Sequence, residues 1–245
     1  MPARAALFLD FDGTLAPIAP RPQDVRVPEW VLPVLGELTA SLQGAVAIVS
    51  GRPISEIDAM LHPMVLPVAG IHGAELRRPD GRIEQHYAAP PPGVDASARA
   101  LVLAHPGLML EVKAAGLVMH YRARPDLELV CKQVLHAALA EAGTEAAATW
   151  EWLDGHAGIE LKQRRVSKGR ALEVFLSMLP FRGRVPVYVG DDVTDEDGIN
   201  AAQAAGGSGV RVGPGATVAH HRLADPAAVG RWLAQAVAVQ QGVDS

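Results

Sequence analysis

The feature that most constrains the fold of this sequence is a series of short, unbroken apolar runs. These runs, rich in valine, isoleucine and leucine, occupy residues 6–9, 45–49, 65–69, 185–189 and 210–212. An unbroken run of this length is typical of a strand buried on both faces of a parallel sheet, whereas a half-exposed strand alternates apolar and polar residues. Helical patterns lie near residues 29–42, 55–61 and 168–179. Strands that alternate with helices predict an α/β fold with a doubly wound, Rossmann-like parallel sheet.

The middle of the chain follows a different order of elements. After a turn at residues 79–81, the pattern predicts a helix, two strands, a second helix between Pro125 and Gly143, and a hairpin of two more strands. The apolar face of that second helix is expected to contain Leu127, Val130, Val134 and Leu135. The order α-β-β-α-β-β predicts a smaller antiparallel α+β module. We expect it to occupy residues 81–162, inserted between two halves of the parallel domain at residues 1–80 and 163–245.

Composition narrows the classes of function. The 245-residue chain carries a formal net charge of −5, which argues against a broad nucleic-acid surface. No apolar run approaches the roughly 20 residues that span a bilayer, and Asp10 and Asp12 interrupt the first apolar segment where a signal peptide has no acids. The single cysteine, Cys131, suits a reducing compartment. We therefore expect a cytoplasmic protein with no nucleic-acid or membrane partner; its oligomeric state stays open, with a monomer as the expectation.

The strongest chemical signal lies in residues 7–15, where an apolar strand leads into two acids. Ligands of open parallel sheets bind beyond the carboxyl ends of the strands. Asp10 is placed to attack phosphorus, and Asp12 to protonate the leaving oxygen and later accept a proton from water. Gly13 lets the backbone approach a phosphate closely, and Thr14 offers a hydroxyl donor. The alternative is an ordinary Asp-Gly turn at a strand end.

A second acidic cluster follows the predicted strand at residues 185–189. It contains Asp191, Asp192, Asp195 and Glu196. Crowded carboxylates repel one another unless a cation compensates them, and Mg²⁺ prefers such hard oxygen ligands. The alternative is an acidic helix N-terminus, which the helix dipole favours. Asp192 and Glu196 fit that alternative equally well.

Two further polar residues stand at the ends of predicted elements. Ser50 follows the run at residues 45–49 and begins a Ser-Gly-Arg turn. Lys168 opens a predicted helix, where a cation is unfavourable unless an anion lies beside it. Taken alone, each has a plain alternative, namely a common helix-entry turn for Ser50 and a solvated surface charge for Lys168.

Taken in their order along the chain, the segments at Asp10, Ser50, Lys168 and Asp191 resemble the four motifs of haloacid dehalogenase-like hydrolases. The resemblance implies a phosphatase that forms an aspartyl phosphate on Asp10 and uses Mg²⁺ as its cofactor. It implies that Asp10, the backbone carbonyl of Asp12 and Asp191 bind the metal, with Asp192 and Asp195 in an outer shell.

The same resemblance implies roles for residues that contact the phosphoryl group. Ser50 would bind it, and Lys168 would hold the charge of the Asp10 carboxylate and of the phosphate. The expected catalytic residues are Asp10, Asp12, Thr14, Ser50 and Lys168.

Two short strings narrow the resemblance. Residues 70–75 read GIHGAE and residues 191–196 read DDVTDE. Both are similar to trehalose-6-phosphate phosphatases, and the similarity extends over essentially the whole chain. It implies hydrolysis of trehalose 6-phosphate in trehalose biosynthesis, with the inserted module as a cap that binds the phosphosugar. Gly51, Arg52 and His72 would lie on the substrate side, although His72 equally fits a hydrogen-bonded loop histidine.

Charged residues alternate along the predicted cap strands. Residues two positions apart share a strand face, and the candidate pairs are Glu111 with Lys113, His120 with Arg122, and Glu160 with Lys162. Such side chains offer the donors and acceptors that sugar hydroxyls need, and the same segments resemble those of the family. The alternative is the wet face of any half-exposed sheet.

Two other functions stay open at this point. One is a sucrose-phosphate or broad-range sugar-phosphate phosphatase of the same superfamily. The other is a non-catalytic phosphosugar-binding partner of a synthase. Proteins of the latter kind usually lose an acid of the motifs, whereas Asp10, Asp12, Lys168 and Asp191 are all present here.

Overall fold

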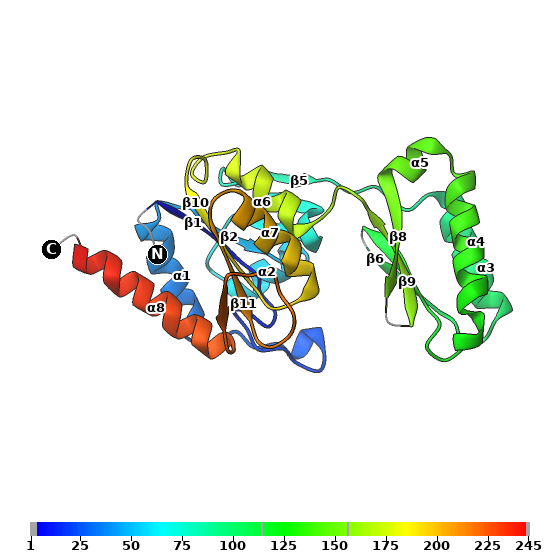
Figure 1. Ribbon diagram of the computed structural model, residues 1–245, viewed down its shortest axis with the longest axis horizontal. Coiled ribbons are helices and arrows are strands. Elements are labelled where there is room, and N and C mark those ends of the chain that lie inside the picture. The colour runs from blue at the N-terminus through cyan, green and yellow to red at the C-terminus, as the bar shows by residue number, and fades with distance from the viewer. Residues whose placement is uncertain (1–3, 114, 156, 244–245) are drawn as a thin grey trace. The chain divides into compact units, whose positions relative to one another are not determined.

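A computed structural model describes residues 4–113, 115–155 and 157–243, and its chain forms two compact units. The larger unit runs up to His86 and resumes at Ser167, while the smaller unit comprises Tyr87–Val166 (Figure 1). This division lies a few residues beyond the expected limits of 81–162, because residues 83–85 still pair within the sheet of the larger unit and residue 163 still pairs within the smaller one.

The larger unit is built on a mostly parallel sheet. Over the described residues it has eight strands in the order β12-β11-β10-β1-β2-β3-β4-β5. All pairs from β12 to β3 are parallel, and the pairs β3–β4 and β4–β5 are antiparallel. Its strands are β1 (Ala5–Leu9), β2 (Val46–Val49), β3 (Val68–Gly70), β4 (Glu75–Arg77), β5 (Ile83–Gln85), β10 (Val185–Gly190), β11 (Ser208–Val212) and β12 (His221–Leu223). The expected doubly wound α/β sheet is confirmed.

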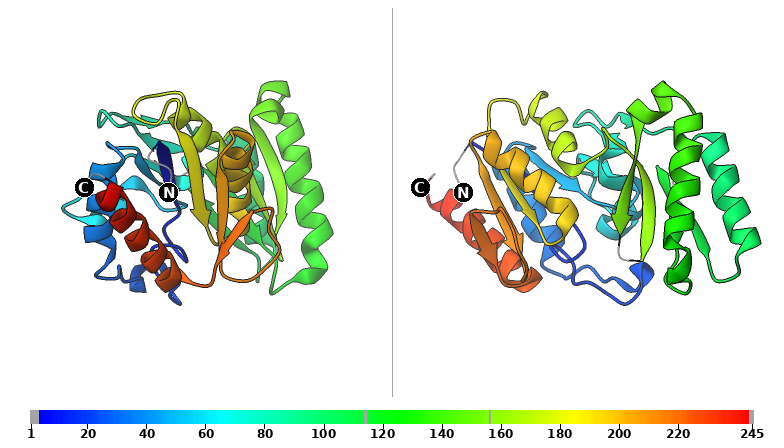
Figure 2. Two further views of the ribbon diagram at one scale, coloured as in Figure 1. Left: turned by 60° about the vertical axis from the view of Figure 1, so that its left-hand side comes forward. Right: turned by 45° about the vertical axis from the view of Figure 1, so that its right-hand side comes forward.

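Helices cover both faces of this sheet. They are α1 (Val31–Ser41), α2 (Ile54–Leu61), α6 (Lys168–Leu176), α7 (Glu196–Ala204) and α8 (Pro226–Val243). Short 3-10 turns are η1 (Pro22–Asp24), η2 (Ile71–Gly73) and η4 (Val193–Asp195). Helices α1 and α8 pack together on one face of the sheet, and α6 and α7 pack together on the other (Figure 2).

The burial of the central strands explains their unbroken apolar sequence. Every residue of β1 and β2 is buried. On one face Phe8 of β1 packs against Phe175 and Phe181, with ring centroids 5.3 Å apart for Phe8 and Phe181. The helical pattern expected at residues 168–179 was too long, because helix α6 ends at Leu176 and Leu179 is exposed.

The smaller unit has an antiparallel sheet with the order β6-β7-β9-β8 among the described residues. Its elements are α3 (Pro92–Ala104), β6 (Met109–Lys113), β7 (Gly116–His120), η3 (Pro125–Leu127), α4 (Glu128–Glu141), α5 (Thr144–Thr149), β8 (Trp150–Gly155) and β9 (Gly158–Gln163). Helices α3 and α4 pack on each other along one side of this sheet (Figure 1). Apart from the added α5, the α-β-β-α-β-β order is confirmed.

The core of the smaller unit corrects one sequence prediction. Helix α4 buries Cys131, Leu135, Ala138 and Leu139. Val130 and Val134, expected on the same face as Leu135, are exposed. The buried face of the helix is therefore rotated about the helix axis from the expected one. The prediction considered only large apolar side chains, whereas Cys131 and Ala138, which are small, belong to the buried face. None of the helices described is long and apolar enough to cross a membrane.

Candidate active site

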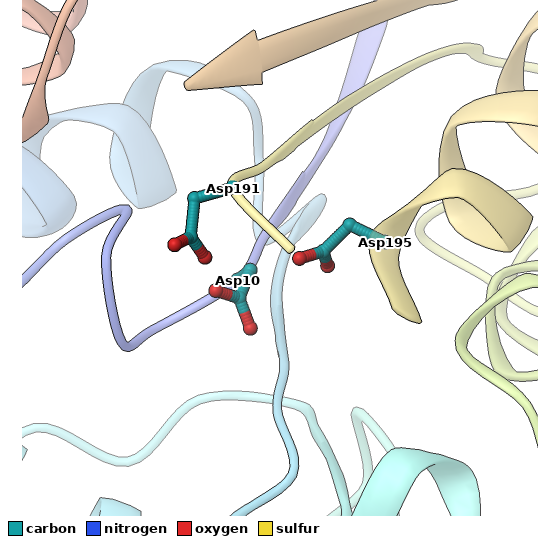
Figure 3. A group of neighbouring side chains, drawn as sticks. All are labelled: Asp10, Asp191 and Asp195. Atoms are coloured by element: carbon teal, nitrogen blue, oxygen red, sulfur yellow. The ribbon is translucent and has the colours of Figure 1, made fainter. Parts of the chain in front are cut away.

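Three aspartates meet beyond the carboxyl ends of strands β1 and β10. Leu9 of β1 pairs with Val189 of β10, so the two strands end side by side. Asp10, Asp191 and Asp195 each place a carboxylate oxygen within 4.8 Å of the others (Figure 3). Parallel pairing therefore unites acids that lie about 180 positions apart in the sequence, as the two acidic motifs predict.

Lys168 lies against this cluster. It opens helix α6, is almost fully buried, and its Nζ donates to Asp10 Oδ1 at 2.7 Å and to Asp195 Oδ1 at 2.8 Å. Burial alone would lower the pKa of Lys168, but the Asp10 and Asp195 carboxylates raise it above its usual range. Burial also raises the pKa of Asp10 well above its usual range, against the opposing effect of Lys168. The expected contact between Lys168 and Asp10 is present.

Asp195 is held by more groups than the sequence suggested. The buried Tyr188 hydroxyl donates to Asp195 Oδ1 at 2.7 Å, and the Asp192 backbone N–H donates to Asp195 Oδ2 at 3.0 Å. Burial, together with the Asp195 charge, raises the pKa of Tyr188 well above its usual range. A Cβ at Gly198 would overlap the Tyr188 ring, so this glycine of α7 makes room for the tyrosine. Asp195 is thus fixed at a single position.

Asp191 lies against the turn that follows β1. Gly13 has a φ of +78°, and a Cβ there would overlap the Asp191 carboxylate. Gly13 is therefore required both for its backbone conformation and for the close approach of Asp191. Burial, together with the charges of Asp195 and Asp192, raises the pKa of Asp191 to about 6.

The residues at this site fit a hard divalent cation. Asp10, Asp191 and Asp195 are neighbouring carboxylates, and the pKa values of Asp10 and Asp191 are raised, largely by burial and partly by the other acids. A dication removes that repulsion, and Mg²⁺ binds through one or two carboxylates while keeping several waters. Asp192 turns its side chain elsewhere and caps η4 by accepting from Val193 N–H at 2.6 Å, which matches the helix-terminus alternative for this residue.

Asp12 forms a two-point contact with Arg52. Arg52 Nε donates to Asp12 Oδ2 at 2.6 Å and Arg52 Nη2 donates to Asp12 Oδ1 at 2.8 Å. Nearby, Ser50 follows β2, and its Oγ accepts from Arg52 N–H at 3.1 Å, which leaves the hydroxyl proton available. The Thr14 hydroxyl is buried and has no hydrogen-bond partner in the part of the chain described.

The segment at residues 70–75 supports the turn that carries Ser50 and Arg52. His72 N–H donates to Ser50 O at 2.9 Å, and Ile71 N–H donates to Arg52 O at 3.0 Å. Ile71 and His72 both have positive φ, of 48° and 57°, a conformation that costs energy and is concentrated at functional sites. The His72 ring covers Gly51, where a Cβ would meet it at 2.8 Å. Gly51, Arg52 and His72 therefore lie together in the segments that follow strands β2 and β3.

In the smaller unit the charged residues form pairs on the face of the sheet that the helices leave open. Lys113 Nζ lies 2.9 Å from Glu160 Oε1, and His120 Nε2 lies 2.9 Å from Glu111 Oε2. Lys162 Nζ lies 3.8 Å from Oε1 of Glu151, a partner that the sequence analysis did not predict. Arg122 was wrongly expected to share a strand face with His120: β7 ends at His120, and Arg122 lies in the following turn.

Several residues that shape the site were missed by sequence reasoning. Tyr188 was overlooked because it lies inside an apolar run. A tyrosine hydroxyl in a buried strand needs a hydrogen-bond partner, so its presence there could have indicated a contact with a nearby acid. Glu75 accepts from Ile54 N–H at 2.9 Å and so caps helix α2, whose preceding Pro53 offers no cap. Glu56 binds Arg52 from four positions along the chain. The Glu75 contact depends on where β4 comes to lie, which the sequence pattern does not specify, whereas the spacing of four between Arg52 and Glu56 was a local signal in the sequence.

Comparisons with known proteins agree with this geometry. A sequence profile of the family described as trehalose-phosphatase matches residues 8–228. Trehalose-6-phosphate phosphatase from Escherichia coli (strain K12) is 38% identical over 233 residues, covering 94% of this chain and 86% of the relative. A probable trehalose-phosphate phosphatase from Sinorhizobium fredii is 39% identical over 212 residues, covering 85% of this chain and 78% of the relative.

Solved structures agree as well. The trehalose-6-phosphate phosphatase of Aspergillus fumigatus (crystal form 3) superposes with a TM-score of 0.78 at 28% identity, covering 96% of this chain and 93% of that chain. A haloacid dehalogenase-like hydrolase from B. subtilis shares the fold with a TM-score of 0.62 at 17% identity, covering 94% and 99%. The chain thus has the fold of the haloacid dehalogenase-like hydrolases, with three aspartates at its strand tips. Within that class, the chain belongs to the trehalose-phosphatase family.

Proposed function

We propose that this chain hydrolyses trehalose 6-phosphate to trehalose and inorganic phosphate, with Asp10 as the nucleophile. The observation that carries the proposal is the burial of Asp10 against Lys168, inside a cluster of three aspartates at the strand tips. A buried carboxylate beside a cation is held in one orientation and is poorly solvated, which suits nucleophilic attack on phosphorus. Membership of the trehalose-phosphatase family supports the substrate.

The proposed reaction has two steps. In the first, a carboxylate oxygen of Asp10 forms a bond to phosphorus as the bond from phosphorus to the sugar oxygen breaks, and Asp12 donates a proton to that oxygen. In the second, water attacks the aspartyl phosphate while Asp12 accepts a proton from it, which releases phosphate and regenerates Asp10. Asp12 thus returns to its starting protonation state after each turnover.

The other residues at the strand tips support these steps. Lys168 compensates the charge on Asp10. The hydroxyl of Thr14, which has no partner among the described residues, and the hydroxyl proton of Ser50 are available to donate to phosphate oxygens. We assign Mg²⁺ to Asp10, Asp191 and the backbone carbonyl of Asp12, with Asp195 held behind them by Lys168 and Tyr188. Bound there, Mg²⁺ supplies positive charge that stabilises the phosphoryl oxygens during transfer.

The charged face of the smaller unit is proposed to bind the sugar. A disaccharide is uncharged and rich in hydroxyls, and paired acids and cations offer both acceptors and donors. The face presents Glu111 with His120, Lys113 with Glu160, and Lys162. Arg122, which lies in the turn after β7, stays a candidate contact with the sugar.

Phosphate release tests the proposal. With Mg²⁺, we expect release from trehalose 6-phosphate to exceed that from glucose 6-phosphate and sucrose 6-phosphate by orders of magnitude. Equal rates on all three would contradict the assigned substrate and favour a broad-range sugar phosphatase. Asp10→Asn should abolish turnover, because an amide is a poor nucleophile. Retained turnover would exclude the covalent route.

A further inference from the structure

The side chain of Arg52 is almost fully buried and uses every nitrogen of its guanidinium. Nε and Nη2 bind the two oxygens of Asp12, Nη2 also donates to Pro22 O at 2.9 Å, and Nη1 donates to Glu56 Oε2 at 2.9 Å. Only 9% of the Arg52 side chain is exposed. A guanidinium so fully engaged has little left to offer a sugar, which is the role expected for Arg52 from the sequence.

The backbone around Arg52 is fixed from behind. Ile71 N–H donates to Arg52 O at 3.0 Å, and a Cβ at Gly70 would lie 2.9 Å from that same oxygen. Glu75 caps the neighbouring helix α2 through Ile54 N–H. Strand β3 and the turn after it therefore lock the residue that grips Asp12, and a planar guanidinium fork has little freedom once both ends are held.

Asp12 gains one defined orientation from this contact. It stands in the turn after β1, and its side chain would otherwise sample several rotamers. A carboxylate bound by a two-point fork keeps further lone-pair positions on its oxygens, where a proton can sit and be passed on. General acid catalysis depends on placing that proton within hydrogen-bond reach of the leaving oxygen.

We propose that Arg52 is a positioning residue that aims Asp12 at the leaving oxygen, rather than a residue that contacts the substrate. The proposal rests on the proposed function, in which Asp12 protonates the departing alcohol. Its consequence is specific: Arg52 matters for phosphate esters whose leaving group needs a proton. It matters little for esters whose leaving group departs as a stable anion.

The test compares kcat/KM of Arg52→Gln on three substrates. These are trehalose 6-phosphate, a small alkyl phosphate such as glycerol 3-phosphate, and 4-nitrophenyl phosphate. The ratio kcat/KM covers only the steps up to cleavage of the ester, so the later hydrolysis of the aspartyl phosphate does not enter. We expect a fall of about 10²-fold on both alkyl esters and less than about fivefold on 4-nitrophenyl phosphate, since general acids contribute roughly 10²–10⁴-fold where they act.

Two further variants separate positioning from structure. Arg77→Gln removes a second buried arginine fork, on Asp58, which is not among the residues at the strand tips, and should change all three values by less than about threefold. Adding Arg52→Gln to Asp12→Asn should cause no further loss, because both changes disable the same acid. Should Arg52→Gln fail to fold in a denaturant titration, Arg52→Lys keeps the charge without the fork and should give the same ranking of substrates with a smaller loss.

Any other pattern of kcat/KM values across the three substrates overturns the proposal. An equal fall on all three substrates assigns Arg52 to phosphate binding or to the fold. A fall confined to trehalose 6-phosphate assigns it to the sugar. A wild-type protein that cleaves the two simpler esters but not trehalose 6-phosphate would refute the proposed substrate alone, and the comparison of the two simpler esters would still decide the role of Arg52.

Discussion

The strand tips of the larger unit and the open sheet face of the smaller unit hold similar ion pairs in opposite surroundings. Lys168 lies 2.7 Å from Asp10, and Lys113 lies 2.9 Å from Glu160. The side chains of the first pair are 3% and 5% exposed, and those of the second are 42% and 38% exposed. The two pairs have almost the same length, so length alone does not indicate what either contributes.

The surroundings decide that contribution. Removing two charges from water costs several kcal/mol for each ion, and a buried pair regains this only with good geometry and further hydrogen bonds. Lys168 donates to two carboxylates, and Asp195 accepts from three donors. The buried charges of these two side chains therefore have most of the hydrogen bonds that they can form. An exposed pair contributes about 0–1 kcal/mol and is easily exchanged. Buried charges at the strand tips are thus fixed in place, whereas those of the smaller unit are free to exchange a protein partner for a ligand.

Replacing the buried cation should give the largest effect. Lys168→Met leaves Asp10 and Asp195 buried without their shared partner, and breaking a buried pair in this way costs about 3–5 kcal/mol. Lys113→Met, the matched change in the exposed pair, should cost less than about 1 kcal/mol. Urea titration of both variants measures the difference, and phosphate release should be lost only in Lys168→Met. Equal destabilisation by the two changes would remove the distinction between the pairs.

Mg²⁺ should stabilise the protein in a pH-dependent way. Without metal, the pKa of Asp191 is about 6, against an ordinary value of 3.8. The unfolded chain therefore ionises Asp191 first, and the metal-free protein should lose stability as the pH rises from about 4 to about 6. Mg²⁺ binds the ionised form, so its stabilising effect should be about 1.4 kcal/mol smaller at pH 5 than at pH 7.5, corresponding to a tenfold competition by protons.

Thermal unfolding with and without Mg²⁺ at the two pH values measures this effect. Asp191→Asn provides the control, because it removes one of the titrating ligands: it should weaken the pH dependence of the metal effect, leaving the part that comes from Asp10, and should remove most of the metal affinity. A stabilisation by Mg²⁺ that is the same at both pH values would place the ion away from Asp191.

Removing the Tyr188 hydroxyl should give an intermediate effect. Tyr188→Phe keeps the ring that fills the space over Gly198 but removes the donor to Asp195. A hydrogen bond to a buried charged group is worth about 1.5–3 kcal/mol, and urea titration should show a loss in that range. Tyr121→Phe is the matched control in the smaller unit, because that hydroxyl lies 3.2 Å from the neutral acceptor Gly158 O and 3.4 Å from the exposed carboxylate of Glu128, and its loss should cost about 1 kcal/mol. A larger loss in the control would contradict the special position of Asp195.

How far the sequence predicts this molecule differs between the two units for a physical reason. In the larger unit the central strands are buried on both faces, so the apolar runs mark β1, β2 and β10 closely, and parallel pairing then forces their tips together. That constraint is why the meeting of Asp10, Asp191 and Lys168 followed from the sequence. The orientation of Asp12 did not follow, since its partner Arg52 comes from another strand end.

In the smaller unit the sequence pattern predicted the order of the elements, but it did not predict which face of helix α4 is buried or which charged residues pair across the sheet. Helix α4 buries small residues such as Ala138 beside Leu135, and a search for large apolar side chains therefore misplaced its buried stripe. The pairing of Lys113 with Glu160 depends on the register of β7 between β6 and β9. Register is set by contacts across the sheet, and alternation along one strand does not contain it.

The smallest effect on stability should come from the exposed charges, and it separates recognition from folding. Lys113→Gln should change the free energy of unfolding by less than about 0.5 kcal/mol, because the pair is exposed. If this face binds the sugar, KM for trehalose 6-phosphate should rise by roughly tenfold with kcat unchanged, the signature of a lost contact made equally in ground and transition states. Arg99→Gln is the matched control: it breaks a similarly exposed pair with Asp95 on helix α3, and should alter neither KM nor stability measurably. An unchanged KM in Lys113→Gln, or an equal rise in Arg99→Gln, would show that the sugar is recognised elsewhere.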